Sequence, residues 1–148
     1  MSLEFRFANQ QDLNTIVEIE NASMSSPWTL DSYKEALDSD HAFIMVADEA
    51  GVCVGFAVFY LTAPESELPD IVVSESYRGR GIGKLLLDAS LRELSLRGVD
   101  TVFLEVRVSN ERARALYEKM GFEEIGRRKY FYSDPIEDAI CMRLEIDS

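Results

Sequence analysis

A cationic, glycine-rich turn between two apolar segments constrains the fold of this chain more than any other feature. The turn spans residues 78–84, carries three glycines and three cationic side chains, and follows the apolar run 71–73. Apolar residues then recur with helical spacing at Ile82, Leu85, Leu86 and Ala89. This order predicts a strand, a tight turn and a helix. Glycines let the backbone approach a ligand closely, and a helix start offers unpaired N–H groups and a positive dipole end, so we predict a bound phosphate group.

The common nucleotide-binding motifs do not account for this turn. A Walker phosphate loop requires Ser or Thr after Gly-Lys, whereas Leu85 follows Lys84 and the first glycine position is occupied by Arg78. The dinucleotide pattern fits Gly79 and Gly81, but its third glycine falls on Lys84. A helix-capping turn with solvated basic residues is the structural alternative, although capping alone does not require three glycines at alternate positions.

Length and composition favour one enzyme-sized domain, residues 1–148. With 148 residues and 47% apolar content the chain can bury a substantial core. The apolar run 52–61 is shorter than the roughly 20 residues of a membrane helix, and residues 1–6 lack the apolar core of a secretory signal, so we expect no membrane association and a cytoplasmic protein. Cys53 and Cys141 are too few for a disulfide framework, and His41 has no partner histidine, so no metal site is expected.

The excess of acidic over basic residues limits the kind of molecule that the protein can bind. Asp and Glu number 27 against 15 Lys and Arg, which gives a net charge of -12. Because a nucleic-acid-binding surface depends on cationic patches, this balance argues against nucleic acid as a direct partner. A cationic acceptor is one interpretation of the excess, and solubility alone is the other.

Apolar periodicity predicts an α/β (α+β) fold with a mixed, mostly antiparallel central sheet and helices on both faces. Four helices are expected: one after an Asn9 cap, one with Thr29 as N-cap, one from the glycine turn to Gly98, and one from a Ser109 cap to Gly121. The predicted strands are 3–8, 41–49, 52–62, 67–74, 101–108, 122–132 and 137–146.

The glycine turn also fits a third phosphate-binding pattern, Arg or Gln, two residues, Gly, one residue, then Gly or Ala. The stretch Arg78-Gly79-Arg80-Gly81-Ile82-Gly83 resembles the pyrophosphate-binding motif of the GCN5-related N-acetyltransferases (GNAT). In that family the turn's backbone amides hold the pyrophosphate of acetyl-CoA, and the pantetheine arm lies along the preceding strand. The resemblance therefore implies acetyl-CoA as co-substrate and an acetyl transfer to an amine.

Glu105 is the candidate general base. In the run 101–108, alternation places Val102, Leu104 and Val106 on one face and Glu105 on the other. Acetyl transfer requires a neutral amine, whereas an α-amine has a pKa near 8, so a group must accept a proton. We expect Glu105 to face the coenzyme and to be partly desolvated. An ion pair on an exposed face, with Arg107 or across the strands, is the structural alternative.

Tyr117 is the candidate acid. Its place in the apolar stripe of the helix after residue 109 makes a core tyrosine the default reading. Its chemical role would be donation to the departing thiolate. The tetrahedral intermediate also needs a donor, and a backbone N–H of strand 71–73 supplies one if a bulge there leaves it unpaired.

Further stretches resemble a subfamily, the bacterial ribosomal-protein-alanine N-acetyltransferases: 104–110, 115–122, 127–130, 137–139 with Met142, and Ser26-Pro27-Trp28. This resemblance implies Glu105 as proton acceptor and Tyr117 as proton donor. It implies an N-terminal α-amine of a small-subunit ribosomal protein as the acceptor, and we expect a monomer or weak homodimer. The implied coenzyme contacts are Ile71, Val72, Val73, Arg78, Gly79, Arg80, Gly81, Ile82, Gly83 and Asn110.

Departures from the subfamily pattern fall where the acceptor would bind. Asp70, preceded by proline, replaces a usual asparagine, and Phe131-Tyr132 with a shortened turn replaces a hairpin that contains Tyr-Pro. Asp70 is therefore a candidate to hold the ammonium or to act as a base, with Tyr130 and Asp138 as further acceptor-binding candidates. A solvated surface acid is the alternative for each carboxylate. Three functions stay open: a protein N-terminal acetyltransferase, an acetyltransferase for a polyamine or amino sugar, and a non-catalytic CoA-binding module.

Overall fold

The computed structural model describes residues 2–23, 29–133 and 135–146. The stretch Ser26-Pro27-Trp28, which contributed to the sequence resemblance, lies outside the described residues. The elements follow in chain order: β1 (Leu3–Phe7), the 3-10 turn η1 (Gln10–Asp12), α1 (Leu13–Ser23), α2 (Leu30–Asp38), β2 (Ala42–Glu49), β3 (Val52–Thr62), β4 (Glu65–Val73), the 3-10 turn η2 (Glu75–Tyr77), α3 (Ile82–Leu96), β5 (Thr101–Arg107), α4 (Glu111–Lys119), β6 (Glu123–Ser133) and β7 (Ile136–Glu145).

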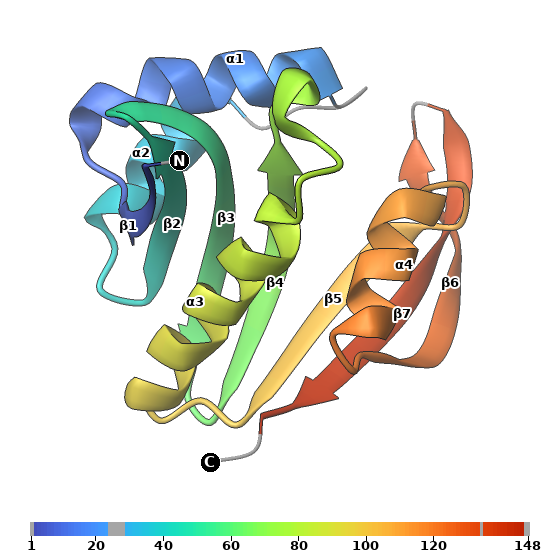
Figure 1. The fold of residues 1–148 in the computed structure, drawn as a ribbon. Coiled ribbons are helices and arrows are strands. Elements are labelled where there is room, and N and C mark those ends of the chain that lie inside the picture. The colour runs from blue at the N-terminus through green and yellow to red at the C-terminus, as the bar shows by residue number, and fades with distance from the viewer. Residues whose placement is uncertain (1, 24–28, 134, 147–148) are drawn as a thin grey trace.

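In the described part of the chain, seven strands form one sheet in the order β1-β2-β3-β4-β5-β7-β6 (Figure 1). Every neighbouring pair is antiparallel except β4 and β5, which are parallel. The predicted mixed, mostly antiparallel sheet is therefore confirmed. None of the helices within these residues is long and apolar enough to cross a membrane.

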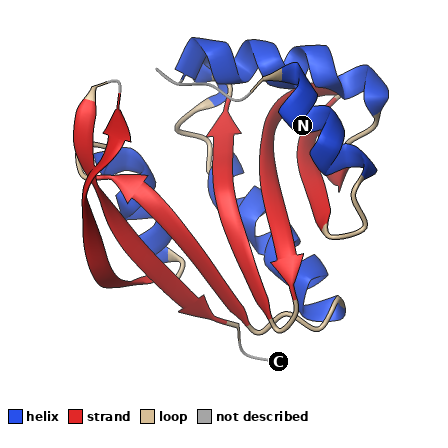
Figure 2. Cartoon of the chain, turned by 180° about the vertical axis from the view of Figure 1, so that it is seen from behind, coloured by secondary structure: helices blue, strands red, loops and turns tan. Residues whose placement is uncertain are grey.

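Helices cover both faces of the sheet, as predicted. On one face α3 buries Leu86 and Leu94 against Phe59 and Leu68, and α4 adds Tyr117 to the same core. The other face holds a second core, in which side chains of α1 and α2 pack on β2, β3 and β4. The helices α3 and α4 lie in front of the sheet in Figure 1 and behind it in the reversed view of Figure 2.

The sheet opens between β4 and β5. Their ladder pairs Glu65–Glu67 with Thr101–Phe103 and stops there, and the two strands diverge toward their C-terminal ends (Figures 1 and 2). On their other edges the two strands stay paired: β4 pairs with β3 as far as Val73, and β5 pairs with β7 as far as Arg107. We call this opening, after residue 67 in β4 and residue 103 in β5, the fork. From Leu68 onward, the edge of β4 that faces the fork has no ladder with β5.

A β-bulge in β4 lies at the start of the fork. Asp70 pairs with Val58 and Glu67 with Tyr60, so two residues of β4 lie opposite Phe59 alone. In a regular strand, residues two apart point to the same face. The extra residue breaks this alternation: Leu68 packs in the core under α3, whereas Asp70 contacts Tyr33 of α2 on the other face. The bulge precedes Ile71, rather than lying within residues 71–73 where the sequence analysis placed it.

The glycine turn has the predicted strand–turn–helix form. Gly79 and Gly81 adopt left-handed φ angles of 80° and 78°, a region that glycine enters without a Cβ clash. Gly81 is the N-cap residue of α3. Gly83 lies inside the helix, where an added Cβ would contact Leu116 of α4 at 3.5 Å. The turn is therefore built by backbone conformation and by the contact of the first turn of α3 with α4.

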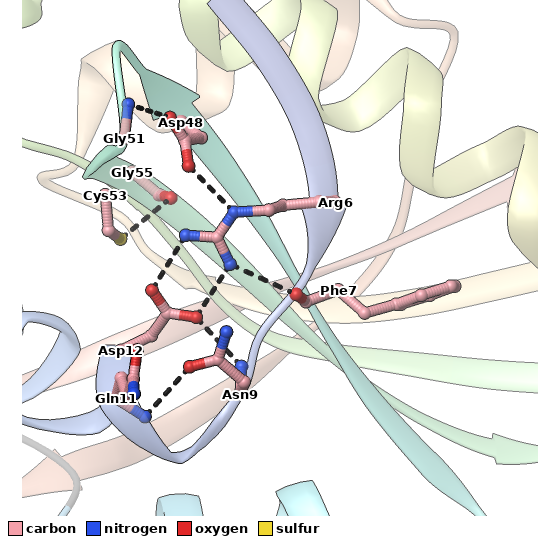
Figure 3. A network of polar contacts seen from close by, with 9 residues as sticks. All are labelled: Arg6, Phe7, Asn9, Gln11, Asp12, Asp48, Gly51, Cys53 and Gly55. Carbon is pink, nitrogen blue, oxygen red and sulfur yellow. Dashed lines mark hydrogen bonds and ion pairs between the residues drawn. The ribbon is translucent and has the colours of Figure 1, made fainter.

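A cluster of polar side chains connects the N-terminal strand to its neighbours (Figure 3). It consists of Arg6, Asp12 and Asp48, and we call it the Arg6 cluster. The Arg6 guanidinium donates from Nε to Asp48 at 2.8 Å and from both terminal nitrogens to Asp12 at 2.8 and 2.9 Å. Asp12 also accepts the Asn9 N–H, which closes a capping box and confirms Asn9 as a cap. Hydrogen bonds and charge from Arg6 hold the pKa of Asp12 below its usual range. The cluster thus joins β1, η1 and β2.

Most predicted strand ends shift by one residue, and two boundaries differ for identifiable reasons. Asn110, not Ser109, caps α4, because its Oδ1 accepts the Ala113 N–H at 3.2 Å. Strand β4 begins at Glu65, two residues earlier than predicted, because it pairs there with Thr62 of β3 and Thr101 of β5. The predicted N-cap Thr29 is confirmed by its bond from the Ser32 N–H.

Candidate active site

The glycine turn presents exposed backbone next to the first turn of α3. Gly79, Arg80 and Gly81 are exposed, and an added Cβ at either glycine would have no atom within 4 Å. Ile82 is 1% exposed and belongs to the core, so only its backbone can serve a ligand. Open space around bare amides at a helix start fits a diphosphate group.

Contacts within the protein hold both turn arginines in the structure. The Nε of Arg78 donates to the Val73 carbonyl at 3.0 Å, which ties the turn to the end of β4. Arg80 lies over the Tyr77 ring, 4.9 Å from its centroid, and donates to the Ser76 carbonyl at 3.4 Å. Arg78 therefore positions the turn, and Arg80 keeps an exposed guanidinium beside it.

The open edge of β4 offers backbone groups directly to the fork. The Ser74 N–H donates to Val54, and hydrogen-bonded pairs alternate along an antiparallel ladder, so Val72 faces β3 as well. Ile71 and Val73 consequently direct their N–H and C=O groups toward the fork. The Ile71 N–H donates to the Asp70 carboxylate and the Val73 carbonyl accepts from Arg78, which leaves the Val73 N–H on the same edge as a donor for a ligand.

Glu105 lies on β5 with the predicted alternation. Val102, Leu104 and Val106 are buried on one face, and Glu105 is exposed on the other. Its Oε1 is 3.8 Å from Nη2 of Arg128 on β6, and the side chains are 37% and 60% exposed. Glu105 thus keeps about a third of its side chain exposed, and its counter-charge is Arg128, which is the cross-strand ion pair that the sequence analysis gave as the structural alternative. Arg107 instead contacts Glu137 at 3.2 Å.

Tyr132, which the sequence analysis did not single out as a site residue, lies in the electrostatic field of Glu105. Burial, followed by the negative charge of Glu105, raises the pKa of Tyr132 to about 12. Its ring also stacks with the Arg107 guanidinium at 4.3 Å. No local sequence pattern indicates this proximity, because the ring and the carboxylate come from different strands.

Tyr117 of α4 is buried, and its ring packs against Phe122 with centroids 5.5 Å apart. Burial raises the pKa of Tyr117, and the negative charges of Asp70 and of Tyr132 raise it further. Tyr117 is thus within electrostatic reach of groups on both arms of the fork. The core position predicted for it is confirmed, and its hydroxyl stays protonated as a hydrogen-bond donor.

Asp70 is not a solvated surface acid. It is 6% exposed and lies beside Glu20 of α1 and Tyr33 of α2, which are 1% and 0% exposed. The Tyr33 hydroxyl donates to Glu20 Oε2 at 2.5 Å and lies 3.5 Å from Asp70 Oδ2, so this hydroxyl contacts both carboxyl groups. Burial, followed by Glu20, raises the pKa of Asp70 well above its usual value. We call these three residues the Asp70 cluster.

The remaining acceptor-binding candidates lie on the β6–β7 hairpin. Tyr130 is 76% exposed with a left-handed φ of 55°, and its N–H donates to Asp138 Oδ1 at 3.0 Å. The Asp138 carboxylate therefore supports the backbone of the hairpin at Tyr130. Asn110 is likewise engaged, in capping α4. The structure thus gives Asp138 and Asn110 positioning contacts within the protein, while the Tyr130 ring is open to an acceptor.

Comparisons with known proteins agree with this geometry. Residues 13–122 match the acetyltransferase (GNAT) family model. The chain is 35% identical to the ribosomal protein bS18-alanine N-acetyltransferases of Escherichia coli, over 91% of this chain and 92% of that protein, and of Haemophilus influenzae, over 88% and 90%. A crystal structure of the Escherichia coli ribosomal-protein-alanine N-acetyltransferase superposes with a TM-score of 0.90 at 32% identity, covering 99% of this chain and 95% of that one. The chain therefore belongs to the GNAT family and is an acetyl-CoA-dependent N-acetyltransferase.

Proposed function

We propose that this enzyme acetylates the N-terminal α-amine of a protein, and that its acceptor is the N-terminal alanine of a small-subunit ribosomal protein. The observation that carries this proposal is the fork, because its open β4 edge runs from Asp70, whose charge reaches Tyr117, to the strand end that leads into the glycine turn. The acceptor class rests on relatives of similar length whose names specify an alanine of ribosomal protein bS18. Tyr130 at the exposed hairpin would contact the acceptor peptide.

Acetyl-CoA would be held by the turn and by the open strand edge. The backbone of Gly79, Gly81 and Gly83 would hold the diphosphate, and the Val73 N–H would bind the amide-containing arm or the thioester oxygen. The thioester supplies an activated acetyl group. The hydrogen bond from Arg78 to the Val73 carbonyl fits this arrangement. It fixes the position of the glycine turn relative to the β4 edge, and both would bind the same ligand.

Glu105 and Tyr117 would handle the protons of the reaction. Glu105 is accessible and accepts a proton from the acceptor nitrogen, and a cationic amine can replace Arg128 as its counter-charge. A thiol near pKa 8.5 and an ordinary tyrosine near 10 make full transfer uphill by about 2 kcal/mol. Because burial raises the pKa of Tyr117 further, Tyr117 stabilises the departing thiolate through a hydrogen bond.

An acceptor panel tests the function directly. The protein is incubated with acetyl-CoA and one of three acceptor types: a short peptide with a free N-terminal alanine, the same peptide with a blocked N-terminus and an internal lysine, or a small amine such as spermidine or glucosamine. We expect thiol release and a mass increase at the α-amine for the first peptide alone. Turnover of the small amines in its place would assign a small-molecule acetyltransferase. Stabilisation by CoA without thiol release would assign a binding module.

Replacement of Glu105 tests its role in turnover. Glu105→Gln should lower kcat by about 10²-fold or more, because a general base contributes on that scale. Stabilisation of the protein by CoA should stay unchanged, since the carboxylate makes no contact with the glycine turn. Glu123→Gln, on the exposed strand β6, is the matched control and should keep full activity. Equal kcat in both variants would remove Glu105 from the mechanism.

A further inference from the structure

The β5 arm of the fork is joined to the β6–β7 hairpin by the side chain of Arg107, the last residue of β5. Its Nη1 donates to the Pro135 carbonyl at 3.0 Å and to Glu137 Oε1 at 3.2 Å. Its guanidinium also lies over the Tyr132 ring, 4.3 Å from the centroid. Tyr132 belongs to β6, Glu137 to β7 and Pro135 to the connection between them. One side chain therefore contacts both strands of the hairpin and the segment that joins them.

Glu137 extends these contacts to the start of α4. Its Oε2 accepts the Ser109 N–H at 2.6 Å while Oε1 binds Arg107, so one carboxylate links the end of β5 to the segment that leads into the helix. The Arg107 and Glu137 side chains are 18% and 17% exposed. We call Arg107, Tyr132 and Glu137 the Arg107 cluster. It joins β5, the hairpin and the entry to α4, and so connects the elements that carry both proposed proton-transfer groups.

The Arg107 cluster lies where the backbone pairing between β5 and β7 ends. Their ladder runs as far as the pair Arg107–Ala139, so residues 136–138 of β7 lie past it and extend beyond the end of β5 (Figure 1). The β6–β7 ladder is itself irregular between residues 128 and 132. Past the last β5–β7 pair, a backbone hydrogen bond from Val108 and the side chains of the Arg107 cluster hold the hairpin to β5. The position of this part of the hairpin therefore depends on side-chain contacts.

The same face of the sheet holds Glu105 and the Arg107 cluster. Alternation along β5 places Glu105 and Arg107 on the face opposite to Val106, which packs in the core with side chains of α3 and α4. The contacts of Glu105 with Arg128 and of Arg107 with Tyr132 place side chains of β6 on this face as well. An acceptor amine that reaches Glu105 therefore lies beside the hairpin, which borders the path of the peptide chain behind it.

We propose that Arg107 and Glu137 are positioning residues for the acceptor, and that they hold the β6–β7 hairpin where it binds the peptide chain behind the α-amine. They act through the hairpin side chains, among them the exposed Tyr130 ring, rather than on the reacting atoms. A peptide gains affinity from this contact, whereas a small amine has no chain to make it. This inference rests on the proposed function, because it presupposes a peptide acceptor.

The chemistry of the Arg107 cluster suits this role. A guanidinium presents its donors in a rigid plane and stacks on aromatic rings, so one side chain can hold a carbonyl, a carboxylate and a ring in a fixed arrangement. A hairpin that is held in place before the peptide binds loses less conformational entropy on binding. Removal of Arg107 would take these contacts from the hairpin together, and the peptide would then have to order the hairpin as it binds.

Steady-state kinetics of the full-length chain with the free-N-terminus alanine peptide test the proposal. Arg107→Met keeps the apolar stem and removes the charge and the donors. We expect KM for the peptide to rise about tenfold or more, because small displacements of a positioning group have effects on that scale. kcat should change much less than KM, and stabilisation of the protein by CoA should stay unchanged, since the glycine turn and the β4 edge are intact. An unchanged KM, or a loss confined to kcat, would overturn the proposal.

Arg127→Met is the matched control. Arg127 also lies on the hairpin and is 3.3 Å from a glutamate, Glu124, but both residues are on β6 and their side chains are 51% and 45% exposed. Because this ion pair links no two elements, its loss should leave KM unchanged. An equal rise of KM in both variants would mean that the contacts specific to Arg107 do not matter, and would overturn the proposal.

Acceptors of different length separate positioning from a purely structural role. The ratio kcat/KM is compared for alanine amide and for a longer peptide with the same N-terminal alanine. We expect the unaltered protein to favour the longer acceptor by roughly tenfold, and Arg107→Met to lose most of this preference, because only the longer acceptor contacts the hairpin. Arg107→Lys keeps the charge but not the stacked plane, and should recover part of the preference. A fall in kcat/KM that is equal for both acceptors would show damage to the fold or to the chemistry, and would refute the positioning role.

Failure of this inference can be told apart from failure of the proposed function. Absence of turnover of both alanine acceptors by the unaltered protein would reject the proposed function and this inference with it. Peptide turnover combined with the same length preference in Arg107→Met would reject only the positioning role. Thermal unfolding of each variant gives the folded fraction by which its rate is divided.

Discussion

The Arg6 cluster and the Asp70 cluster bury similar numbers of carboxylates by opposite means. Asp12 and Asp48 are 7% and 8% exposed and share one guanidinium, whereas Glu20 and Asp70 both contact the Tyr33 hydroxyl. The first arrangement lowers the pKa of a carboxyl and the second raises it. Opposite charges stabilise the attachment of β1, whereas two acids buried together raise a carboxyl pKa at a cost in stability.

The largest expected effect on the free energy of unfolding comes from removing the cation of the Arg6 cluster. Arg6→Met keeps the apolar stem but leaves Asp12 and Asp48 without their cation, and should lower the free energy of unfolding by roughly 2–4 kcal/mol. The estimate stays below that for a fully buried pair because the Arg6 side chain is 31% exposed. Urea denaturation measures it. Turnover per folded molecule should not change, since Arg6 lies outside the fork. A decrease in the free energy of unfolding below about 0.5 kcal/mol would mean that the Arg6 cluster contributes no more than an exposed ion pair.

A smaller loss is expected for Asp12→Asn, about 1–2 kcal/mol at pH 7, because charge-assisted bonds become neutral ones. The folded-state pKa of Asp12 is lowered, so its contribution is present above the unfolded value near 4 and disappears as pH falls through the folded value. The difference from the unaltered protein should therefore shrink below pH 4. Urea denaturation at pH 3.5 and pH 7 tests this. A difference that does not depend on pH would contradict the charge-based explanation.

Asp70→Asn should stabilise the protein, in contrast to the two substitutions above. We expect it to raise the free energy of unfolding by about 1 kcal/mol at pH 7. The folded-state pKa of Asp70 is raised, so the proton it binds favours folding below pH 4, and this advantage is lost as pH rises through the folded value. The gain from asparagine should therefore grow between pH 4 and pH 7. Melting temperatures over this range measure it. Destabilisation at neutral pH would mean that the carboxylate holds the fold together.

Glu105→Gln should have the smallest effect on stability, within about 0.5 kcal/mol, because its pair with Arg128 is long and exposed. Urea denaturation alongside Asp70→Asn gives a direct contrast between a partly exposed carboxylate and a buried one. A marked loss of stability in Glu105→Gln would show that its ion pair supports the β6–β7 hairpin. The large effect on kcat could not then be assigned to chemistry alone.

Local sequence patterns were sufficient for most of the fold. Strand alternation placed Val102, Leu104 and Val106 inward, and the glycine turn followed by helical spacing predicted the start of α3. These predictions succeeded because each depends on residues within a few positions of one another. The α4 cap was displaced by one residue because Ser109 and Asn110 are both good caps, and the sequence does not distinguish them.

The candidate site was predictable only where one element carries it. The turn, Glu105 and Tyr117 each lie within a recognisable motif. The partner of Glu105, Arg128 on β6, lies in another part of the chain and was not identified from the sequence. Asp70 lies 37 residues from Tyr33, and Tyr33 lies 13 from Glu20. Whether these side chains meet depends on how α1 and α2 pack on β4 and on the bulge at residues 68–69.

The sequence by itself determined a GNAT-type strand, turn and helix and a mostly antiparallel sheet. It also placed Glu105 and Tyr117 in recognisable motifs. These features could be predicted because backbone conformation and apolar periodicity are local properties. Only the tertiary structure decided that β4 and β5 part after three paired residues and that Asp70 turns toward α2. It also decided that Glu20 and Asp70 are buried together around the Tyr33 hydroxyl. These features follow from long-range packing, which fixes burial and so decides which charges are costly.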